Sequence, residues 1–185
     1  MKRLILKISA KLLLLLLLLR YKNIWALKKY MQTKERMHPL YIAAYDGFFA
    51  KRGSWIGYDA CFKGEPCFPH GYFGVFVSGG ARVGVNAVIF QGVTIGSNSL
   101  SDSQNNGAPI LGDNIYIGAG AAIIGNVNIG DNCRIGANAV VYRSMPANSI
   151  AVQCATRVIQ KETLDNRFFT NRVGHAVYYD NGVWK

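Results

Sequence analysis

The chain has 185 residues, half of them apolar, and a formal net charge of +11 at neutral pH. A core is therefore easily built, which excludes a disordered chain, and the length suits one domain with terminal additions. Residues 1–36 hold ten Lys or Arg against Glu35 alone, a net +9, so the other 149 residues carry only +2. That remainder has no basic patch interleaved with aromatic residues, and nucleic acid is not an expected partner.

The N-terminal segment, residues 1–30, is basic and leucine-rich, with an unbroken run from Leu12 to Leu19. A secretory signal peptide is not expected, because Arg, Tyr and Lys follow this run where a cleavage site would need small residues. A membrane-spanning helix needs about twenty uninterrupted apolar residues, and Lys7 and Lys11 leave a shorter stretch.

Two interpretations of residues 1–30 remain open. In the first, they form an interfacial helix, with Lys and Arg around a leucine-rich body and Trp25 nearby, which favours an anionic cytoplasmic leaflet. In the second, the leucine run packs between neighbouring subunits. Cys61, Cys67, Cys133 and Cys154 form no CxxC pair, so a reduced, cytoplasmic protein is expected in either case. The first interpretation adds a peripheral position at the inner face of the membrane.

Residues 37–52 have apolar groups at mixed helical spacing, with Pro39 near the start and Tyr41, Tyr45 and Phe49 following. This pattern predicts a second, short helical element. We therefore expect residues 1–55 to form a helical N-terminal segment.

From about Ile56 to Ile159 an aliphatic residue recurs every six residues, a period that neither a helix nor an ordinary strand produces. It predicts a parallel β-helix, in which each unit supplies one short strand and one turn. The fifth residue of each unit is small or β-branched and fills a second inward position. One repeat cannot bury its own face, so the stack folds together. The aliphatic positions are Ile56, Phe62 and Phe68 before a slip in spacing, then Val77, Val83, Ile89, Ile95, Leu111, Ile117, Ile123, Ile129, Ile135 and Val141, and the fifth positions are Ala81, Ala87, Val93, Ile115, Ala121, Val127, Cys133 and Ala139.

The turns are predicted to use Gly and Asn, as in Ile129-Gly130-Asp131-Asn132, because these residues accept dihedrals that bulky residues resist. The repeat is interrupted once, between Ile95 and Leu111, where one unit carries ten extra, mostly polar residues. So polar a stretch predicts a projecting loop over residues 97–110. Such loops often carry binding residues, and a tolerated insertion without a role is the alternative.

The expected fold is therefore mainly β. A parallel β-helix over residues 56–159 follows the short N-terminal helical segment and precedes an aromatic C-terminal tail, residues 160–185, which loses the period. We expect this tail to pack on the β-helix or on a neighbouring chain.

Several ordered motifs lie within residues 56–161: Pro69-His70-Gly71, Val83-Gly84, Phe90-Gln91-Gly92-Val93-Thr94-Ile95-Gly96, Ile117-Gly118-Ala119-Gly120-Ala121 and Ile135-Gly136-Ala137. In these motifs the chain resembles the hexapeptide-repeat acyltransferases, most of all the serine acetyltransferase and polysaccharide O-acetyltransferase branch. The resemblance implies a left-handed parallel β-helix, a homotrimer, and acetyl-CoA in the groove between adjacent subunits.

The resemblance implies that His70 is the catalytic general base. A hydroxyl is too weak an acid to attack a thioester unaided, and a neutral imidazole within hydrogen-bond reach can take its proton. A turn residue satisfied by a neighbour is the alternative. For acetyl-CoA, the resemblance implies backbone contacts at Ala119 and Ala137, a turn at Gly96 that leads to the loop, and phosphate contacts from two cations, Arg157 and Lys161. These two cations could equally be solvated surface charges.

The chain departs from the serine-specific enzymes at three sites. Pro69 stands where an Asp precedes the catalytic histidine, Gly107 and its neighbour replace an Arg-His pair after the loop, and Trp55 replaces the Asp that orients the histidine. Asp59, Glu65 or a main-chain carbonyl would then have to fix the histidine tautomer. A site for an amino acid's charges would need the missing groups, so serine is disfavoured as the acceptor.

The expected function is therefore an O-acetyltransferase that moves acetyl from acetyl-CoA to a hydroxyl of a saccharide, in a surface polysaccharide or its precursor. Acetylation of serine, or of an amino sugar's nitrogen, is the second enzymatic interpretation. A non-catalytic β-helix scaffold is the alternative from another class. No metal is expected, because zinc catalysis needs clustered histidines and the chain has three, of which only His70 lies in the repeats.

Overall fold

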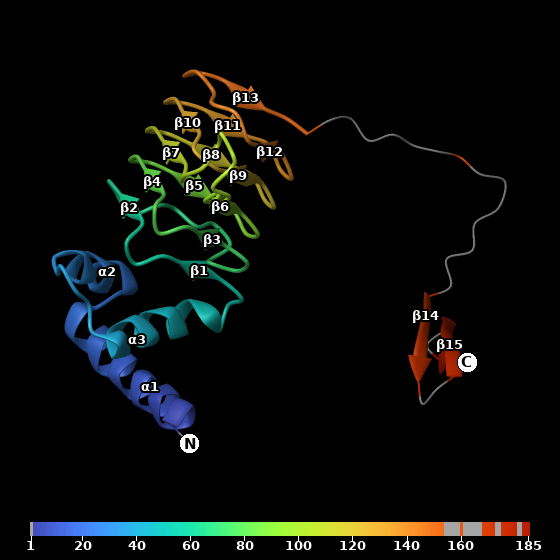
Figure 1. The fold of residues 1–185 in the computed structure, drawn as a ribbon, viewed down its shortest axis with the longest axis horizontal. Coiled ribbons are helices and arrows are strands. Elements are labelled where there is room, and N and C mark those ends of the chain that lie inside the picture. Colours follow the sequence, from blue (N-terminus) through green and yellow to red (C-terminus); the bar gives the residue numbers. More distant parts are fainter. Residues whose placement is uncertain (1, 154–159, 161–167, 173–174, 181–182) are drawn as a thin grey trace. The chain divides into compact units, whose positions relative to one another are not determined.

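The computed structural model describes residues 2–153, 160, 168–172, 175–180 and 183–185, with side chains of the first helix from Ser9 onward. The chain divides into two compact units, residues 1–153 and residues 154–185. The first unit contains three helices, followed by a parallel β-helix of short strands that is here called the coil (Figure 1).

The three helices are α1 (Lys2–Tyr21), α2 (Ile24–Gln32) and α3 (Pro39–Ala50). The second predicted element is confirmed as α3, which starts with Pro39 at its first turn, where a missing N–H costs nothing. No helix among the described residues is both long and apolar enough to cross a membrane.

Residues 1–30 were predicted to form one basic helix, and this prediction is wrong in one respect. The helix ends at Tyr21, and a second helix follows. Lys22 has a left-handed φ of 68°, which ends α1. Asn23 then caps α2: its side-chain oxygen accepts a hydrogen bond from the Ala26 amide at 2.7 Å. Such a cap satisfies an amide that the first helical turn leaves without a backbone partner.

Three parallel sheets form the sides of the coil, and each of its middle turns adds one strand to each sheet. The first turn contributes only an isolated bridge at Cys67 to sheet C, and the last only one at Met145 to sheet B. Sheet A contains β1 (Trp55–Ile56), β3 (Phe76–Val77), β6 (Thr94–Gly96), β9 (Ala122–Ile124) and β12 (Val140–Val141). Sheet B contains β2 (Cys61–Phe62), β4 (Arg82–Val83), β7 (Ile110–Leu111) and β10 (Asn128–Ile129). Sheet C contains β5 (Val88–Ile89), β8 (Tyr116–Ile117), β11 (Arg134–Ile135) and β13 (Ile150–Ala151).

The core of the coil is the predicted one. Every aliphatic position from Val77 to Val141 is at most 5% exposed, and every fifth-position residue, Cys133 included, is buried with them. The slip in spacing is also visible, because Phe62 and Phe68 are only partly buried. They contact Trp25 of α2, with ring centroids 5.2 and 6.0 Å away. The prediction of two inward positions in each unit is therefore confirmed for residues 77–141.

The turns between sheets B and C use asparagine. Asn86, Asn114, Asn132 and Asn148 all have φ between 56° and 61°, in the left-handed region that asparagine tolerates. Their side-chain amides form a ladder along the coil, with N···O distances of 3.0, 3.1 and 3.3 Å. Gly130 serves a different purpose: a Cβ there would overlap the backbone nitrogen of Ala147 in the next turn of the coil.

Helix α2 covers the first turn of the coil. The Lys28 ammonium donates to the carbonyl oxygen of Tyr58 at 2.7 Å and to that of Ala60, and Gln32 also donates to Ala60 at 2.8 Å. Both carbonyls lie just before β2, the edge strand of sheet B, and the two side chains of α2 supply them with donors. Lys28 is 3% exposed, and burial lowers its pKa from 10.5 to about 8 despite the nearby Asp59 carboxylate.

The second unit contains an antiparallel sheet of β14 (Phe168–Arg172), β15 (His175–Asp180) and β16 (Val183–Trp184). Thr170 pairs with Val177, and Tyr179 with Trp184. The aromatic tail was expected only to pack, so this sheet is a difference from the prediction.

Candidate active site

The corner between sheets C and A, here called the C–A corner, stacks equivalent residues from successive turns of the coil. Phe73, Gln91, Ala119 and Ala137 each lie just before a strand of sheet A. Each is followed by a residue with a left-handed φ: Gly74, Gly92, Gly120 and Asn138 at 66°, 72°, 69° and 57°. Backbone hydrogen bonds of 2.8–3.0 Å join each level to the next, from Gly92 to Phe73, from Gly120 to Gln91 and from Asn138 to Ala119.

His70 lies in an insertion at this corner. The aliphatic spacing from Phe68 to Val77 is nine residues instead of six, so three extra residues extend this turn. Gly71, with φ of 70°, reverses the chain directly after His70. The imidazole is exposed, and it lies beside the next turn of the coil.

The His70 ring contacts two side chains of that next turn. Its Nδ1 lies 2.7 Å from Oε1 of Gln91. The His70 and Phe90 rings are nearly perpendicular, at 88°, with centroids 5.4 Å apart, and Phe90 in turn contacts Tyr116 with centroids 5.2 Å apart. An amide oxygen only accepts, so Nδ1 donates the proton of this hydrogen bond. In the neutral imidazole, the other nitrogen, Nε2, then carries the free lone pair of a base.

The hydrogen bond between His70 and Gln91 corrects the prediction that Asp59 or Glu65 orients the histidine. Asp59 lies against Gly57 and Gly79, at the different corner where sheet A leads to sheet B. Glu65 lines a pocket beside α2. Neither hydrogen-bonds His70, and Gln91 holds the ring instead. The signal in the sequence was the register: Gln91 is the one polar side chain among the four stacked positions of the C–A corner.

Of the residues predicted to contact acetyl-CoA, Ala119 and Ala137 share the corner with His70. Ala119 is half-buried and Ala137 exposed, and their small side chains leave the backbone open along this edge. Gly96 ends β6 and so lies across sheet A, at the corner with sheet B; a Cβ there would approach Ile124 to 2.9 Å. Arg157 and Lys161 lie outside the described residues.

The projecting loop starts after Gly96, as predicted, and ends before β7. Asn98 and Gly107 close it with two backbone hydrogen bonds of 2.9 Å. Asn105 fastens it to the coil by donating to the carbonyl oxygen of Ile124 at 3.2 Å. The loop is therefore an ordered branch from the A–B corner.

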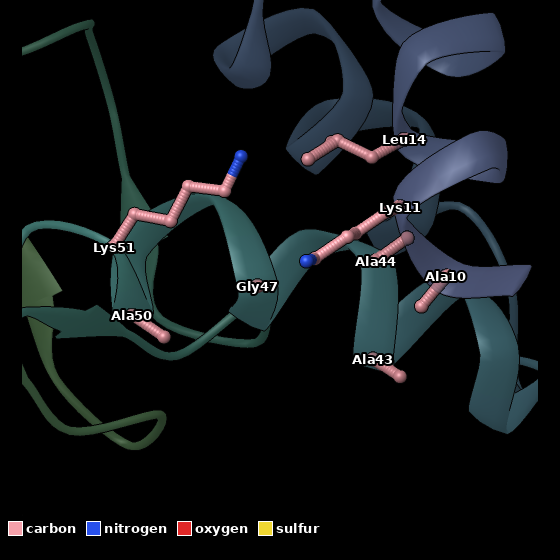
Figure 2. A pocket seen from close by; sticks show the side chains of 8 residues that line it. All are labelled: Ala10, Lys11, Leu14, Ala43, Ala44, Gly47, Ala50 and Lys51. Atoms are coloured by element: carbon pink, nitrogen blue, oxygen red, sulfur yellow. The ribbon is translucent and has the colours of Figure 1, made fainter. Parts of the chain in front are cut away.

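A pocket of about 380 Å³ lies elsewhere, between α1 and α3. Its lining is mostly small and apolar, and the side chains of Lys11 and Lys51 point toward one another across it (Figure 2). None of its lining residues belongs to the C–A corner. Within the part of the chain that the structure describes, no group of three or more His, Cys, Asp or Glu side chains could hold a metal ion.

Comparison with known proteins gives consistent matches. The family model of the bacterial transferase hexapeptide (six repeats) matches residues 108–143, and that of the hexapeptide repeat of succinyl-transferase matches residues 80–100. A serine acetyltransferase of Staphylococcus xylosus is 38% identical over 93 residues, which are 50% of this chain and 42% of the relative. One of Synechococcus elongatus is 40% identical over 92 residues, which are 50% of this chain and 36% of the relative.

A solved structure of soybean serine acetyltransferase complexed with serine matches with a TM-score of 0.59 and 30% identity, over 72% of this chain and 53% of that one. The chain thus spans about half the length, or less, of these relatives. The matches confirm the resemblance to the hexapeptide-repeat acyltransferases and the left-handed parallel β-helix.

Proposed function

We propose that this chain, a hexapeptide-repeat protein of the serine acetyltransferase branch, transfers an acetyl group from acetyl-CoA to a hydroxyl group, with His70 as general base. One observation carries the proposal: the Nδ1 to Oε1 distance of 2.7 Å between His70 and Gln91. In the neutral imidazole this hydrogen bond selects the tautomer with its proton on Nδ1, so Nε2 carries the free lone pair that a general base needs.

In the proposed reaction, Nε2 of His70 removes the proton of the acceptor hydroxyl while its oxygen forms a bond to the thioester carbonyl carbon. When the C–S bond breaks, the imidazolium returns the proton to the departing thiolate. Both transfers use one nitrogen, and Gln91 holds the ring in place throughout. No cysteine or serine nucleophile is required, because the acceptor itself attacks.

For acetyl-CoA we propose the edge of the C–A corner that runs from His70 past Ala119 to Ala137. Both alanines lie on this edge in consecutive turns of the coil, so an extended chain along it would meet the two backbones in sequence. Gly96 lies at the corner between sheets A and B, away from this edge, so we assign it only the start of the projecting loop. Arg157 and Lys161 remain proposed phosphate contacts. Because acetyl-CoA is a cytoplasmic donor, the proposal also implies a cytoplasmic protein.

L-serine is the acceptor that the relatives favour. The matched proteins of known activity are serine acetyltransferases, and none of the reported matches names a saccharide. They support the serine alternative better than the saccharide acceptor that the sequence analysis put first.

A saccharide hydroxyl remains the second candidate because of the surroundings of His70. Serine brings an ammonium and a carboxylate, which need charged partners, whereas the contacts of His70 are with Gln91 and Phe90, both uncharged. Phe73 is 59% exposed and Tyr116 is 41% exposed at or beside the same corner. Exposed aromatic faces with a polar group nearby suit the apolar faces and hydroxyls of a sugar ring.

An acceptor screen tests the proposal and separates the two candidates. Free thiol released from acetyl-CoA would be followed with L-serine, neutral saccharides and amino sugars as acceptors. Acceptor-dependent release with serine supports the first candidate, and release with a sugar supports the second. Absence of release with every acceptor, in a protein that binds CoA, would contradict acetyl transfer and favour a non-catalytic scaffold.

We also propose a homotrimer. Along sheet A, the outward residues stand in register in consecutive strands: Trp55 pairs with Phe76, Phe76 with Thr94, and Ala122 with Val140. Trp55, Phe76 and Val140 are 40%, 45% and 64% exposed. An exposed apolar stripe of this kind is a typical contact surface, and hexapeptide-repeat acetyltransferases are generally trimers.

A further inference from the structure

Helix α1 presents an exposed leucine face. Leu12, Leu15, Leu16 and Leu19 are 61%, 58%, 55% and 74% exposed, and their spacing of three, four and seven residues puts them on one side of the helix. The opposite side is anchored: Ala10, Leu14 and Leu17 are at most 8% exposed, and α1 packs against α3. The leucine face is therefore not part of the core of this unit.

Basic residues border the leucine face. At 100° per residue, Lys11 falls on one flank of the face and Arg20 on the other, and both side chains are exposed. Helix α1 contains five Lys or Arg and no acidic residue. The two described side chains that flank the leucines are therefore both basic, and α1 itself carries no acid to offset them.

We propose that this leucine face binds an anionic membrane surface, with α1 lying in the plane of the interface. Apolar side chains flanked by cations are the arrangement of an interfacial helix, whose binding energy combines apolar burial with attraction to anionic headgroups. Each Lys or Arg near such a surface contributes about 1 kcal/mol. The same face packed against a second copy would bring two sets of five positive charges together without an acid to pair them, which disfavours self-association.

The first test compares two matched triple variants in co-sedimentation with lipid vesicles. Leu12→Gln, Leu15→Gln and Leu19→Gln change the proposed face. The control, Ile150→Gln, Tyr142→Gln and Val152→Gln, removes three apolar side chains of nearly equal exposure, 62%, 60% and 75%, from the coil. Circular dichroism checks that both variants fold.

We expect the wild-type chain and the control to sediment with vesicles that contain phosphatidylserine, and much less with phosphatidylcholine alone. The leucine variant should bind roughly tenfold more weakly, since apolar burial is a large part of interfacial binding. Equal sedimentation of the leucine variant and the wild type would overturn the proposal. A leucine variant whose mass by light scattering falls below that of the wild type without vesicles would also overturn it, in favour of packing between subunits.

The second test concerns charge. Lys11→Gln with Arg20→Gln should reduce binding to phosphatidylserine vesicles by about tenfold or more at low salt, if each cation contributes about 1 kcal/mol. The control pair, Arg134→Gln with Arg143→Gln, removes the same charge from exposed positions of the coil and should bind as the wild type does. Equal losses in the two pairs would mean that net charge, and not this face, governs binding. Both tests measure binding alone, so they succeed or fail independently of acetyl transfer.

Discussion

Gln91 holds the imidazole of His70 through a hydrogen bond of 2.7 Å that crosses from one turn of the coil to the next. A neutral amide thus takes the place of the carboxylate that often orients a catalytic histidine. Because the amide carries no charge, it selects the tautomer without stabilising the imidazolium strongly.

Gln91→Ala should therefore lower kcat by about tenfold to a hundredfold, because the ring loses its orientation while Nε2 remains. The KM for acetyl-CoA should stay nearly constant, since Gln91 is proposed to touch the histidine and not the donor. Gln91→Glu keeps an acceptor oxygen and should retain more activity than the alanine variant. Its carboxylate stabilises the imidazolium, so the acidic limb of its pH–rate profile should move to higher pH. An alanine variant with unchanged kcat would show that Gln91 does not position the base.

Lys28 predicts a pH dependence of stability. Its pKa in the folded chain is about 8, against 10.5 in the unfolded chain, so between these pH values the unfolded state binds more protons. The free energy of unfolding should therefore rise with pH across this interval. Above pH 10 the trend reverses, because burial also raises the pKa of Tyr45.

Urea unfolding between pH 7 and pH 10 measures this dependence, and Lys28→Met should lose the rise. The control is Lys29→Met, on the exposed side of α2, which should keep it. A rise that persists in Lys28→Met would mean that another group causes it.

Two glycine substitutions should have opposite effects. A Cβ at Gly84 would overlap the carbonyl oxygen of Gly112 and the carboxylate of Asp113 in the next turn of the coil. Gly84→Ala should therefore destabilise the fold by about 1–3 kcal/mol or more. At Gly47, within α3, a Cβ meets nothing within 4 Å, and alanine should stabilise the helix by up to about 1 kcal/mol. Thermal unfolding measures both, and equal melting temperatures would contradict the close stacking of the coil.

The proposed trimer can be tested on sheet A. Phe76→Lys puts a charge in the middle of the apolar stripe and should reduce the mass measured by light scattering toward that of a monomer. Ile110→Lys makes the same change at nearly the same exposure, 44% against 45%, on sheet B, and should leave the mass unchanged. A wild-type monomer that is fully active would contradict both the trimer and a site between subunits.

The coil was predicted well from the sequence, because the six-residue spacing of aliphatic residues indicates which side chains point inward. Val77 and Ile135, for example, occupy aliphatic positions of the repeat, and both are fully buried. The break between α1 and α2 was missed, although Asn23 is a common helix-capping residue that could have marked it.

The candidate site was predictable only in part. His70 and the alanines of the corner came from motif positions, and the register of the coil then explains why Ala119 and Ala137 share an edge. The register places Gln91 at the corner, but its contact with His70 was not predictable, because that contact depends on how a three-residue insertion around His70 turns toward the next level. No periodicity fixes such a turn.

The central claim, acetyl transfer with His70 as the base, is tested most directly by thiol release from acetyl-CoA by His70→Ala. We predict a fall in turnover of about a hundredfold or more with nearly unchanged CoA binding, because only proton transfer is lost. The control, His38→Ala, changes a histidine at the start of α3 and should keep its activity. Turnover of His70→Ala close to that of the wild type would contradict the account.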